Sequence, residues 1–155
     1  RQMCIRDRYE MICGGVITGL NELGLDAQFV PLNDIVVNDK KISGNAQTRK
    51  QGIILQHGTI LMDVDVDQMF DLLKVPDEKM KGKLIATIKE RVTSIQHQTG
   101  TSHTFEEVAA ALATGFANTF PNVTFAASEL SDEEHDAVAE LMNAKYSQPD
   151  WNNKR

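Results

Sequence analysis

The sequence contains few of the features that mark several protein classes. Only two of its 155 residues are cysteines, Cys4 and Cys13, and both lie near one end. A disulfide-stabilised domain uses more cysteines, spread along the chain, so we expect a reducing, cytoplasmic compartment. No apolar run approaches the roughly 18 residues that a membrane-spanning helix requires. A disulfide scaffold and a membrane span are therefore excluded for this chain.

Positive charge is also scarce, because 16 Lys and Arg stand against 22 Asp and Glu and give a net charge of −6. Such a surface repels a phosphate backbone, so we expect no nucleic acid as a partner, and no membrane either. The remaining composition is that of an ordinary globular protein, with 41% hydrophobic and 25% charged residues. The length fits one domain, or most of one.

The two ends of the chain differ from the rest. Residues 1–8 (RQMCIRDR) are rich in charge, lack an apolar period and are not followed by the apolar run of a signal peptide. They resemble the translation of a sequencing adapter, so we expect a non-native leader outside the fold. Residues 150–155 end without a clear terminator, and we expect the natural protein to extend beyond both ends.

Apolar residues at helical spacing predict helices over 9–23 and 104–120. Cys13 lies on the first apolar stripe, so we expect it in the core. A capping box at Ser131–Glu134 predicts the start of a third helix, and a short helix is expected over 66–73.

Strands are predicted over 25–30 and on both sides of Asn38-Asp39, a pair suited to a tight hairpin turn. The most apolar run, 52–62, predicts a buried strand in which Gly58 allows a close backbone approach. Three shorter segments are expected as a strand or turn (90–95), a loop (96–102) and a weak strand (122–127). Hairpin-connected strands interleaved with helices favour an α+β fold, with a mixed, mostly antiparallel sheet and flanking helices.

The densest polar signal lies between Asn33 and Arg49. Asp34 precedes Lys41 by seven residues on strands that a tight turn joins, and such pairing can bring both to one end of the sheet. A lysine fixed there can neutralise charge that develops on a phosphate or carboxylate, and the small residues 43–46 let a ligand approach the backbone. In the alternative interpretation these lysines only keep an exposed hairpin soluble.

Histidines give weaker signals. His57 interrupts the apolar run 52–62, where it either faces a ligand or is a hydrogen-bonded structural residue. The other histidines have no two-histidine helical spacing and no cysteine partners, so a metal site made by them is not indicated.

The same residues resemble the lipoate–protein ligase A family. The motif N-D-I-V-V-x-x-K-K-I-S-G-N-A-Q (33–47) is followed by L-Q-H-G-T-I-L (55–61), E-R-V-T-S-I (90–95) and K-Y-S-Q-P-D-W-N (145–152). The resemblance covers residues 9–152. It implies the catalytic-domain fold that biotin and lipoate ligases share.

The resemblance also implies a reaction in two steps. Lipoate and ATP, with Mg²⁺, first give lipoyl-AMP and pyrophosphate. The lipoyl group then passes to a lysine of a carrier, either a lipoyl domain of a 2-oxo acid dehydrogenase complex or the glycine-cleavage H-protein. Lys41 would be the catalytic lysine that bridges the lipoate carboxylate and the α-phosphate.

The remaining site residues are implied by the same match. Asn33 and Asp34 would face the nucleotide, with Asp34 at the Mg²⁺ ion, which prefers oxygen ligands. The residues expected to bind ATP and lipoyl-adenylate are Asn33, Asp34, Lys41, Ser43, Gly44, Ala46, His57 and Gly58.

Other members of the superfamily provide the alternatives. Biotin ligases usually continue the lysine motif with G-G-I-L, which is absent here. Octanoyltransferases place a nucleophilic cysteine shortly before this hairpin, where this chain has residues 29–33 (FVPLN), and Cys13 lies on an upstream helix. We therefore favour the ligase and keep an octanoyltransferase, a biotin ligase and an inactive binding fragment as alternatives.

One family landmark has no counterpart in this sequence. The family carries an arginine- and glycine-rich loop, which we expect N-terminal to Tyr9. A small accessory domain is also absent, and in some relatives it is a separate polypeptide. We therefore expect residues 9–152 to form the C-terminal two-thirds of a catalytic domain, and the chain alone to be inactive.

Overall fold

The computed structural model describes residues 5–72 and 78–154 of the chain. They form two units, Arg1–Thr124 and Phe125–Arg155. Each unit is described separately.

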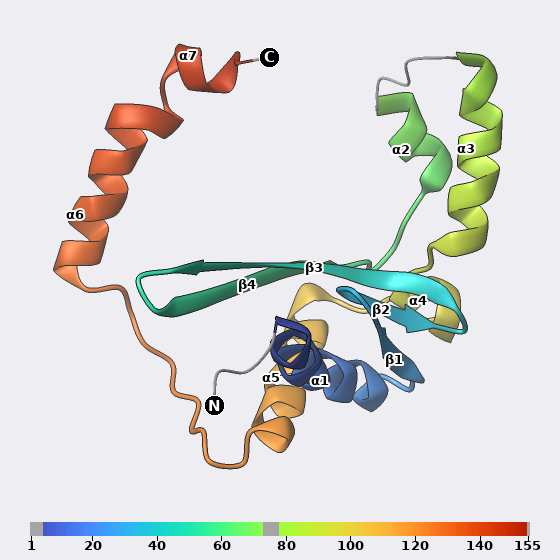
Figure 1. The fold of residues 1–155 in the computed structure, drawn as a ribbon, viewed down its shortest axis with the longest axis horizontal. Coiled ribbons are helices and arrows are strands. Elements are labelled where there is room, and N and C mark those ends of the chain that lie inside the picture. Colours follow the sequence, from blue (N-terminus) through green and yellow to red (C-terminus); the bar gives the residue numbers. More distant parts are fainter. Residues whose placement is uncertain (1–4, 73–77, 155) are drawn as a thin grey trace. The chain divides into compact units, whose positions relative to one another are not determined.

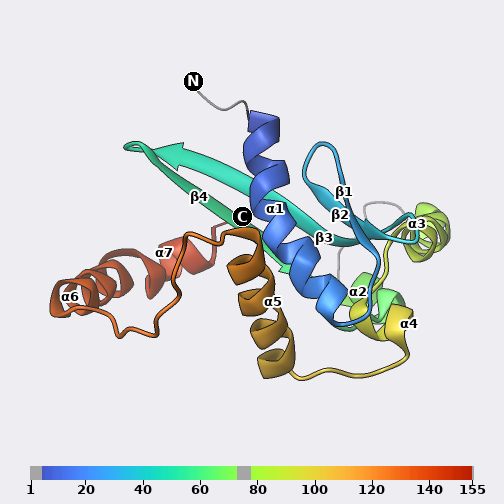
Figure 2. The same cartoon turned by 90° about the horizontal axis from the view of Figure 1, so that it is seen from below.

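An antiparallel sheet forms the centre of the first unit. Its strands lie in the order β1 (Ala27–Val30), β2 (Asp34–Val37), β3 (Lys40–Lys50) and β4 (Ile53–Ile60). Helices α1 (Ile5–Glu22) and α5 (Phe105–Thr119) lie against one face of this sheet (Figures 1 and 2). Three further helices follow β4: α2 (Val66–Leu72), α3 (Glu78–Arg91) and α4 (Ile95–Thr99). The prediction of an α+β fold with a mostly antiparallel sheet and flanking helices is confirmed.

The hydrophobic core lies between the sheet and helices α1 and α5. Alternate residues of a strand point to opposite faces, so β2 sends Ile35 and Val37 into the core. Helix α1 contributes Leu20 and Cys13, which are both fully buried, and α5 contributes Val108. The prediction that Cys13 is a core residue is confirmed.

The turn between β2 and β3 was also predicted correctly. Asn38 and Asp39 have φ values of 49° and 60°, the left-handed conformation that a two-residue hairpin turn requires. Asparagine and aspartate adopt this conformation more readily than most residues. The turn joins Asp34 and Lys41 on neighbouring strands.

Helices α1 and α5 approach each other at glycines. A methyl group added to Gly115 of α5 would overlap the backbone of Gly19 on α1, with its Cα only 2.6 Å away. A methyl group added to Gly15, one turn earlier on α1, would lie 2.6 Å from the ring of Phe116. The two helices therefore pack backbone to backbone, and this contact fixes the layer beneath the sheet.

The structure places residues 5–8 in a helix, whereas the sequence predicted a helix only from residue 9. Helix α1 begins at Ile5, four residues before the predicted start. Asp7 in the first turn is favourable there because the N-terminus of a helix carries partial positive charge. The non-native origin of residues 1–8 stays a prediction.

Strand β4 exists as predicted, but it is not buried. Ile53 and Leu55 are 69% and 59% exposed. The reason is position: β4 is an edge strand of this sheet, and helices α1 and α5 lie against only one of the sheet's two faces (Figure 1). Apolar composition alone does not show which face of a strand is covered.

The remaining differences concern short elements. The loop predicted over 96–102 contains helix α4, which Ser94 caps by accepting a hydrogen bond from His97 N at 3.2 Å. Residues 90–95 contain the end of α3 and a single bridge from Val92 to Lys41 instead of a strand. The weak strand predicted over 122–127 is irregular chain. Helix α2 ends at Leu72, near the predicted position, and Pro76 lies outside the described residues.

The second unit contains helix α6 (Asp132–Leu141), a π-helical turn η1 (Met142–Tyr146) and helix α7 (Pro149–Asn152). The predicted capping box is confirmed, because Ser131 and Glu134 each bond the backbone of the other. Lys145 Nζ lies 4.1 Å from the centre of the Trp151 ring, a cation–π contact. None of the helices in the described ranges of the chain has the length and apolar character needed to cross a membrane.

Candidate functional site

The predicted central pair forms in the structure. Lys41 Nζ lies 2.7 Å from Asp34 Oδ1, and the two side chains are 43% and 33% exposed. An ion pair as accessible as this contributes about 0–1 kcal/mol to stability. The pair therefore adds little to the stability of the fold, and its role toward a ligand stays a prediction.

Gly44 makes room for the lysine. It pairs with Asp34 across the sheet, and a methyl group on Gly44 would lie 2.9 Å from both Cε and Nζ of Lys41. The same position is 3.7 Å from Asp34 Oδ1. The Lys41 side chain therefore lies over Gly44, against bare backbone.

The backbone of Lys41 is fixed by the segment that follows α3. Thr93 N donates to the carbonyl of Lys41 at 2.9 Å, and Val92 forms the single parallel bridge to the same residue. Thr93 and Ser94 are almost fully buried. Residues 92–94, part of the E-R-V-T-S-I landmark, therefore anchor the start of β3.

The structure divides the predicted site residues between two faces of the sheet. The face opposite α1 and α5 carries Asp34, Lys41, Gly44, Ala46 and, paired with Ala46, His57. We call this side the open face. It brings five of the eight predicted residues together on β2, β3 and β4.

Ser43 and Gly58 lie on the other face. Ser43 is only 2% exposed and pairs with Ile35, and Gly58 pairs with Asn45, which points toward the helices. Pairing between β2 and β3 shifts at Ile35/Val36, so Ile42 and Ser43 are both buried. The ligand-binding roles of Ser43 and Gly58 stay predictions, and the structure places both residues on the face of the sheet that Lys41 does not occupy.

Asn33 lies at the start of β2 and is tied to Asn45. Asn45 N donates to the carbonyl of Asn33 at 3.0 Å, and Asn45 Nδ2 donates to the same oxygen at 3.1 Å. The Asn33 carboxamide donates in return to the Asn45 carbonyl. These bonds hold Asn33, the residue that precedes Asp34, in place. Asn45 is not among the predicted site residues, because nothing in the local pattern marks its contact with Asn33.

Cys13 is the one cysteine in the described part of the chain, and it is fully buried. Burial raises the pKa of its thiol, and a hydrogen bond from Gln56 Nε2 at 3.5 Å offsets part of that rise. A protonated, enclosed thiol is a poor nucleophile. Cys4 lies outside the described residues.

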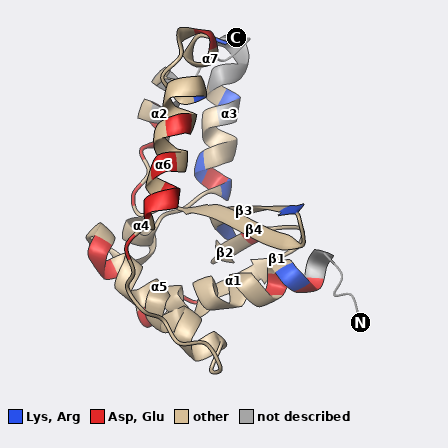
Figure 3. Cartoon of the chain, turned by 90° about the vertical axis from the view of Figure 1, so that its left-hand side faces the viewer, with Lys and Arg blue, Asp and Glu red and all other residues tan. Residues whose placement is uncertain are grey.

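The charge of the β3–β4 hairpin is opposite to that of the chain. No Asp or Glu occurs between Lys40 and Met62, and Lys and Arg mark both ends of β3 (Figure 3). The chain as a whole has a net charge of −6. The open face therefore suits an anionic ligand.

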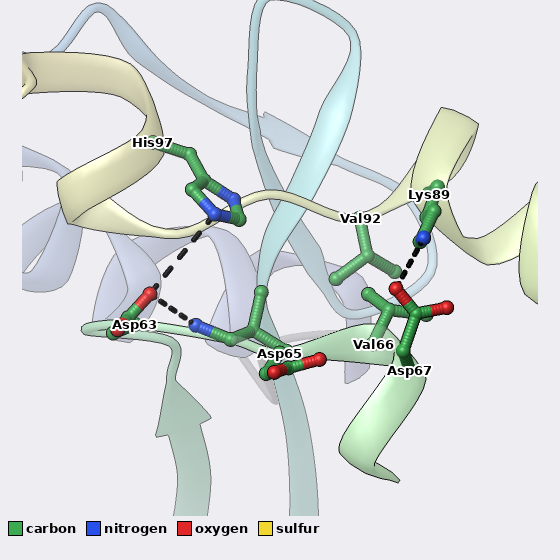
Figure 4. Close-up of a pocket in the computed structure, with 8 residues that line it drawn as sticks. Asp63, Asp65, Val66, Asp67, Lys89, Val92 and His97 are labelled. Carbon is green, nitrogen blue, oxygen red and sulfur yellow. Dashed lines mark hydrogen bonds and ion pairs between the residues drawn. The ribbon is translucent and has the colours of Figure 1, made fainter. Parts of the chain in front are cut away.

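A cavity of about 430 Å³ lies away from the open face, between α3, α4 and the segment after β4 (Figure 4). Its carboxylates already have partners within the chain. Asp67 pairs with Lys89 at 2.5 Å, Asp65 accepts from the first turn of α2, and Asp63 lies 4.0 Å from His97. Local ion pairs and hydrogen bonds therefore explain the three aspartates of this segment.

The described residues show no metal cluster. No group of three or more His, Cys, Asp or Glu side chains gathers within residues 5–72 and 78–154 in a way that could hold an ion. Nucleotide enzymes commonly hold Mg²⁺ by one or two carboxylates together with substrate phosphates, and the role of Asp34 at such an ion stays a prediction.

Comparisons with known proteins agree with the residues described above. Residues 1–117 match the family model of the lipoyl protein ligase A/B catalytic domain. The chain therefore belongs to this family, and the predicted resemblance is confirmed.

Curated relatives include octanoyltransferases. The chain is 35% identical to octanoyltransferase LipM of Geobacillus kaustophilus, over 97% of this chain and 62% of that protein. LipM of Bacillus subtilis is 33% identical, again over 97% of this chain and 62% of the relative. The chain thus spans less than two thirds of the length of these relatives.

Solved structures of ligases are also similar. A bipartite lipoate protein ligase from Thermoplasma acidophilum, studied with its E2 lipoyl domain, gives a TM-score of 0.84 at 33% identity, over 97% of this chain and 59% of that chain. A lipoate–protein ligase A bound with ATP gives a TM-score of 0.75 at 28% identity, over 98% of this chain and 60% of that chain. These comparisons place the chain in the superfamily of lipoate ligases and transferases, whose named members are enzymes.

Proposed function

We propose that the protein containing this chain is an ATP-dependent lipoate–protein ligase of the cytoplasm. The observation that carries the proposal is the Lys41 ammonium, held 2.7 Å from Asp34 over Gly44 on the open face. The basic hairpin around it suits two anionic reactants, a carboxylate and a nucleotide.

In the first step, an oxygen of the lipoate carboxylate attacks the α-phosphorus of ATP. The bond from that phosphorus to the bridging oxygen breaks, and pyrophosphate leaves. The ammonium of Lys41 offsets the repulsion between the two anions and the charge that gathers on the phosphorus. Gly44 and Ala46 leave the strand flat enough for the adenylate to lie against it, beside His57.

Asn33 and Asp34 are proposed to face the nucleotide. A Mg²⁺ ion bound with ATP would neutralise phosphate charge, and Asp34 is the carboxylate that could hold it. The ion would supply charge neutralisation at the phosphates, while Lys41, held by Asp34, would face the α-phosphate. A solved relative with bound ATP supports the choice of nucleotide.

In the second step, the ε-amine of a carrier lysine attacks the acyl carbonyl. An amide forms, the bond from the acyl carbon to the phosphate oxygen of the mixed anhydride breaks, and AMP leaves as the amine loses a proton. We propose lipoyl domains of 2-oxo acid dehydrogenase complexes, or the glycine-cleavage H-protein, as carriers. The bipartite ligase of T. acidophilum supports a separate accessory polypeptide as a further partner, so we expect little or no turnover from the 155 residues alone.

An octanoyltransferase is the second candidate. The names of the curated relatives support this alternative more directly than they support the ligase reaction. Its mechanism through an acyl-thioester needs a reactive thiol. In the described ranges the thiol present is that of Cys13, which burial keeps protonated inside the core. We therefore rank the ligase first.

Transfer assays distinguish the two candidates. The natural protein that contains this chain would be given an apo carrier domain with lipoate and ATP, or with an octanoyl carrier protein and no ATP. The ligase proposal predicts carrier modification only in the first mixture, detected as a mass increase. Modification only in the second mixture would refute it and establish the octanoyltransferase.

A further inference from the structure

We propose that Asn45 is a positioning residue, which holds Asp34 in place for its ion pair with Lys41, and that Gly58 provides the space that Asn45 needs. This inference rests on the proposed function, because it concerns the same ion pair. Asn45 lies on the helix-facing side of β3 and does not point to the open face. It would act through the backbone of Asn33.

The carboxamide of Asn45 is buried and fully used. It is 7% exposed, and Asn45 Nδ2 donates to the Asn33 carbonyl at 3.1 Å and to Ser43 Oγ at 3.2 Å. Asn45 Oδ1 accepts from Gln56 Nε2 at 3.4 Å. Buried polar networks with every group satisfied are rigid, because breaking one bond leaves an unpaired polar group.

The contact with Asn33 comes just before Asp34 in the chain. The Asn33 carbonyl receives two donors from Asn45, and the Asn33 carboxamide donates back. The peptide that leads into Asp34 is therefore held from the interior side. The ion pair is half-exposed and adds little stability of its own, so it cannot hold Asp34 by itself.

Gly58 completes the arrangement from the neighbouring strand. It pairs directly with Asn45, and a methyl group on Gly58 would overlap Asn45 Oδ1 and lie 3.0 Å from the Gly44 carbonyl. Any larger residue at position 58 would displace the carboxamide. The space that Asn45 needs therefore explains why the Q-H-G-T motif has glycine at position 58, without any contact between Gly58 and a ligand.

The first test is the NMR signal of the Lys41 ammonium, recorded in the natural protein that contains this chain. Lysine labelled at Cε and Nζ gives this signal, and Lys41→Arg assigns it. Asp34→Asn removes the charge partner of Lys41. The change in chemical shift that it causes is taken as the full effect of losing the ion pair. We expect Asn45→Ala and Gly58→Ala each to move the Lys41 signal in the same direction by at least half of that shift.

Matched controls separate positioning from general disturbance. Gln47→Ala removes another carboxamide from the same side of β3 that also bonds Gln56 but does not reach Asn33. Gly82→Ala adds a methyl group with no atom within 4 Å. Both should leave the Lys41 signal unchanged. A Lys41 signal that stays in place in folded Gly58→Ala protein would overturn the inference, whether or not the protein is a ligase.

Kinetics provide the second readout. If the protein forms lipoyl-AMP, Asn45→Ala should lower the rate of that step about tenfold, as expected for a misplaced catalytic group. In the Asp34→Asn background the same substitution should have no further effect, because the residue it positions is gone. Equal losses in both backgrounds would show that Asn45 does not act through Asp34.

Discussion

Gly44→Ala should separate the function of the site from the stability of the fold. The added methyl group would lie 2.9 Å from Cε and Nζ of Lys41, where ordinary contacts begin at 3.4 Å. The ammonium must therefore move by roughly half an ångström, and misplacement by about 1 Å costs about a hundredfold in rate. We expect about a tenfold loss in the rate of adenylate formation.

Stability should hardly change in the same variant. The atoms that the methyl group meets belong to the far end of a flexible side chain, so they can move without disturbing the strand. We expect the free energy of unfolding to change by less than about 0.5 kcal/mol. Urea unfolding and pyrophosphate release would be measured on the same preparations, with Gly82→Ala as the control. Full activity, or a loss of activity that follows a loss of stability, would refute this reasoning.

The other predictions concern the helical layer and the core. Gly115→Ala should lower the free energy of unfolding by about 1–3 kcal/mol, because its clash is with backbone; a stabilised variant in a urea titration would contradict the close packing of α1 and α5. Thr104→Ala should cost about 1 kcal/mol by removing the cap of α5, and a urea midpoint equal to that of the wild type would contradict this. Burial raises the pKa of Cys13, so its stabilising contribution should be complete below about pH 8.5 and decrease as the pH rises through the folded pKa. Unfolding titrations from pH 7 to 10 should show a steeper loss in the wild type than in Cys13→Ala; parallel curves would contradict it.

Local chemistry explains which elements could be predicted from the sequence. The Asn38-Asp39 turn and the capping box at Ser131 depend on residues a few positions apart, and both appear in the structure. The pairing of Asp34 with Lys41 follows from that turn. Helix α4 was missed because it is short, and its cap and its end at Gly100 resemble the signals of a loop.

Features that depend on distant contacts could not be predicted. The shift in pairing at Ile35/Val36 buries Ser43 next to the buried Ile42. Regular alternation along β3 would have placed these two neighbours on opposite faces of the sheet. The exposure of β4 depends on its place at the edge of the sheet. The role of Asn45 depends on Asn33, twelve positions away, and on the space beside Gly58.

Pyrophosphate release tests the central claim most directly. The natural protein that contains this chain would be supplied with ATP and Mg²⁺ and with lipoate, octanoate or biotin in parallel, and Lys41→Ala would serve as the control. The account predicts release that depends on lipoate and is lost in Lys41→Ala protein of unchanged stability. Release that persists in Lys41→Ala, or no release with any acid while an octanoyl group passes to the carrier without ATP, would contradict it.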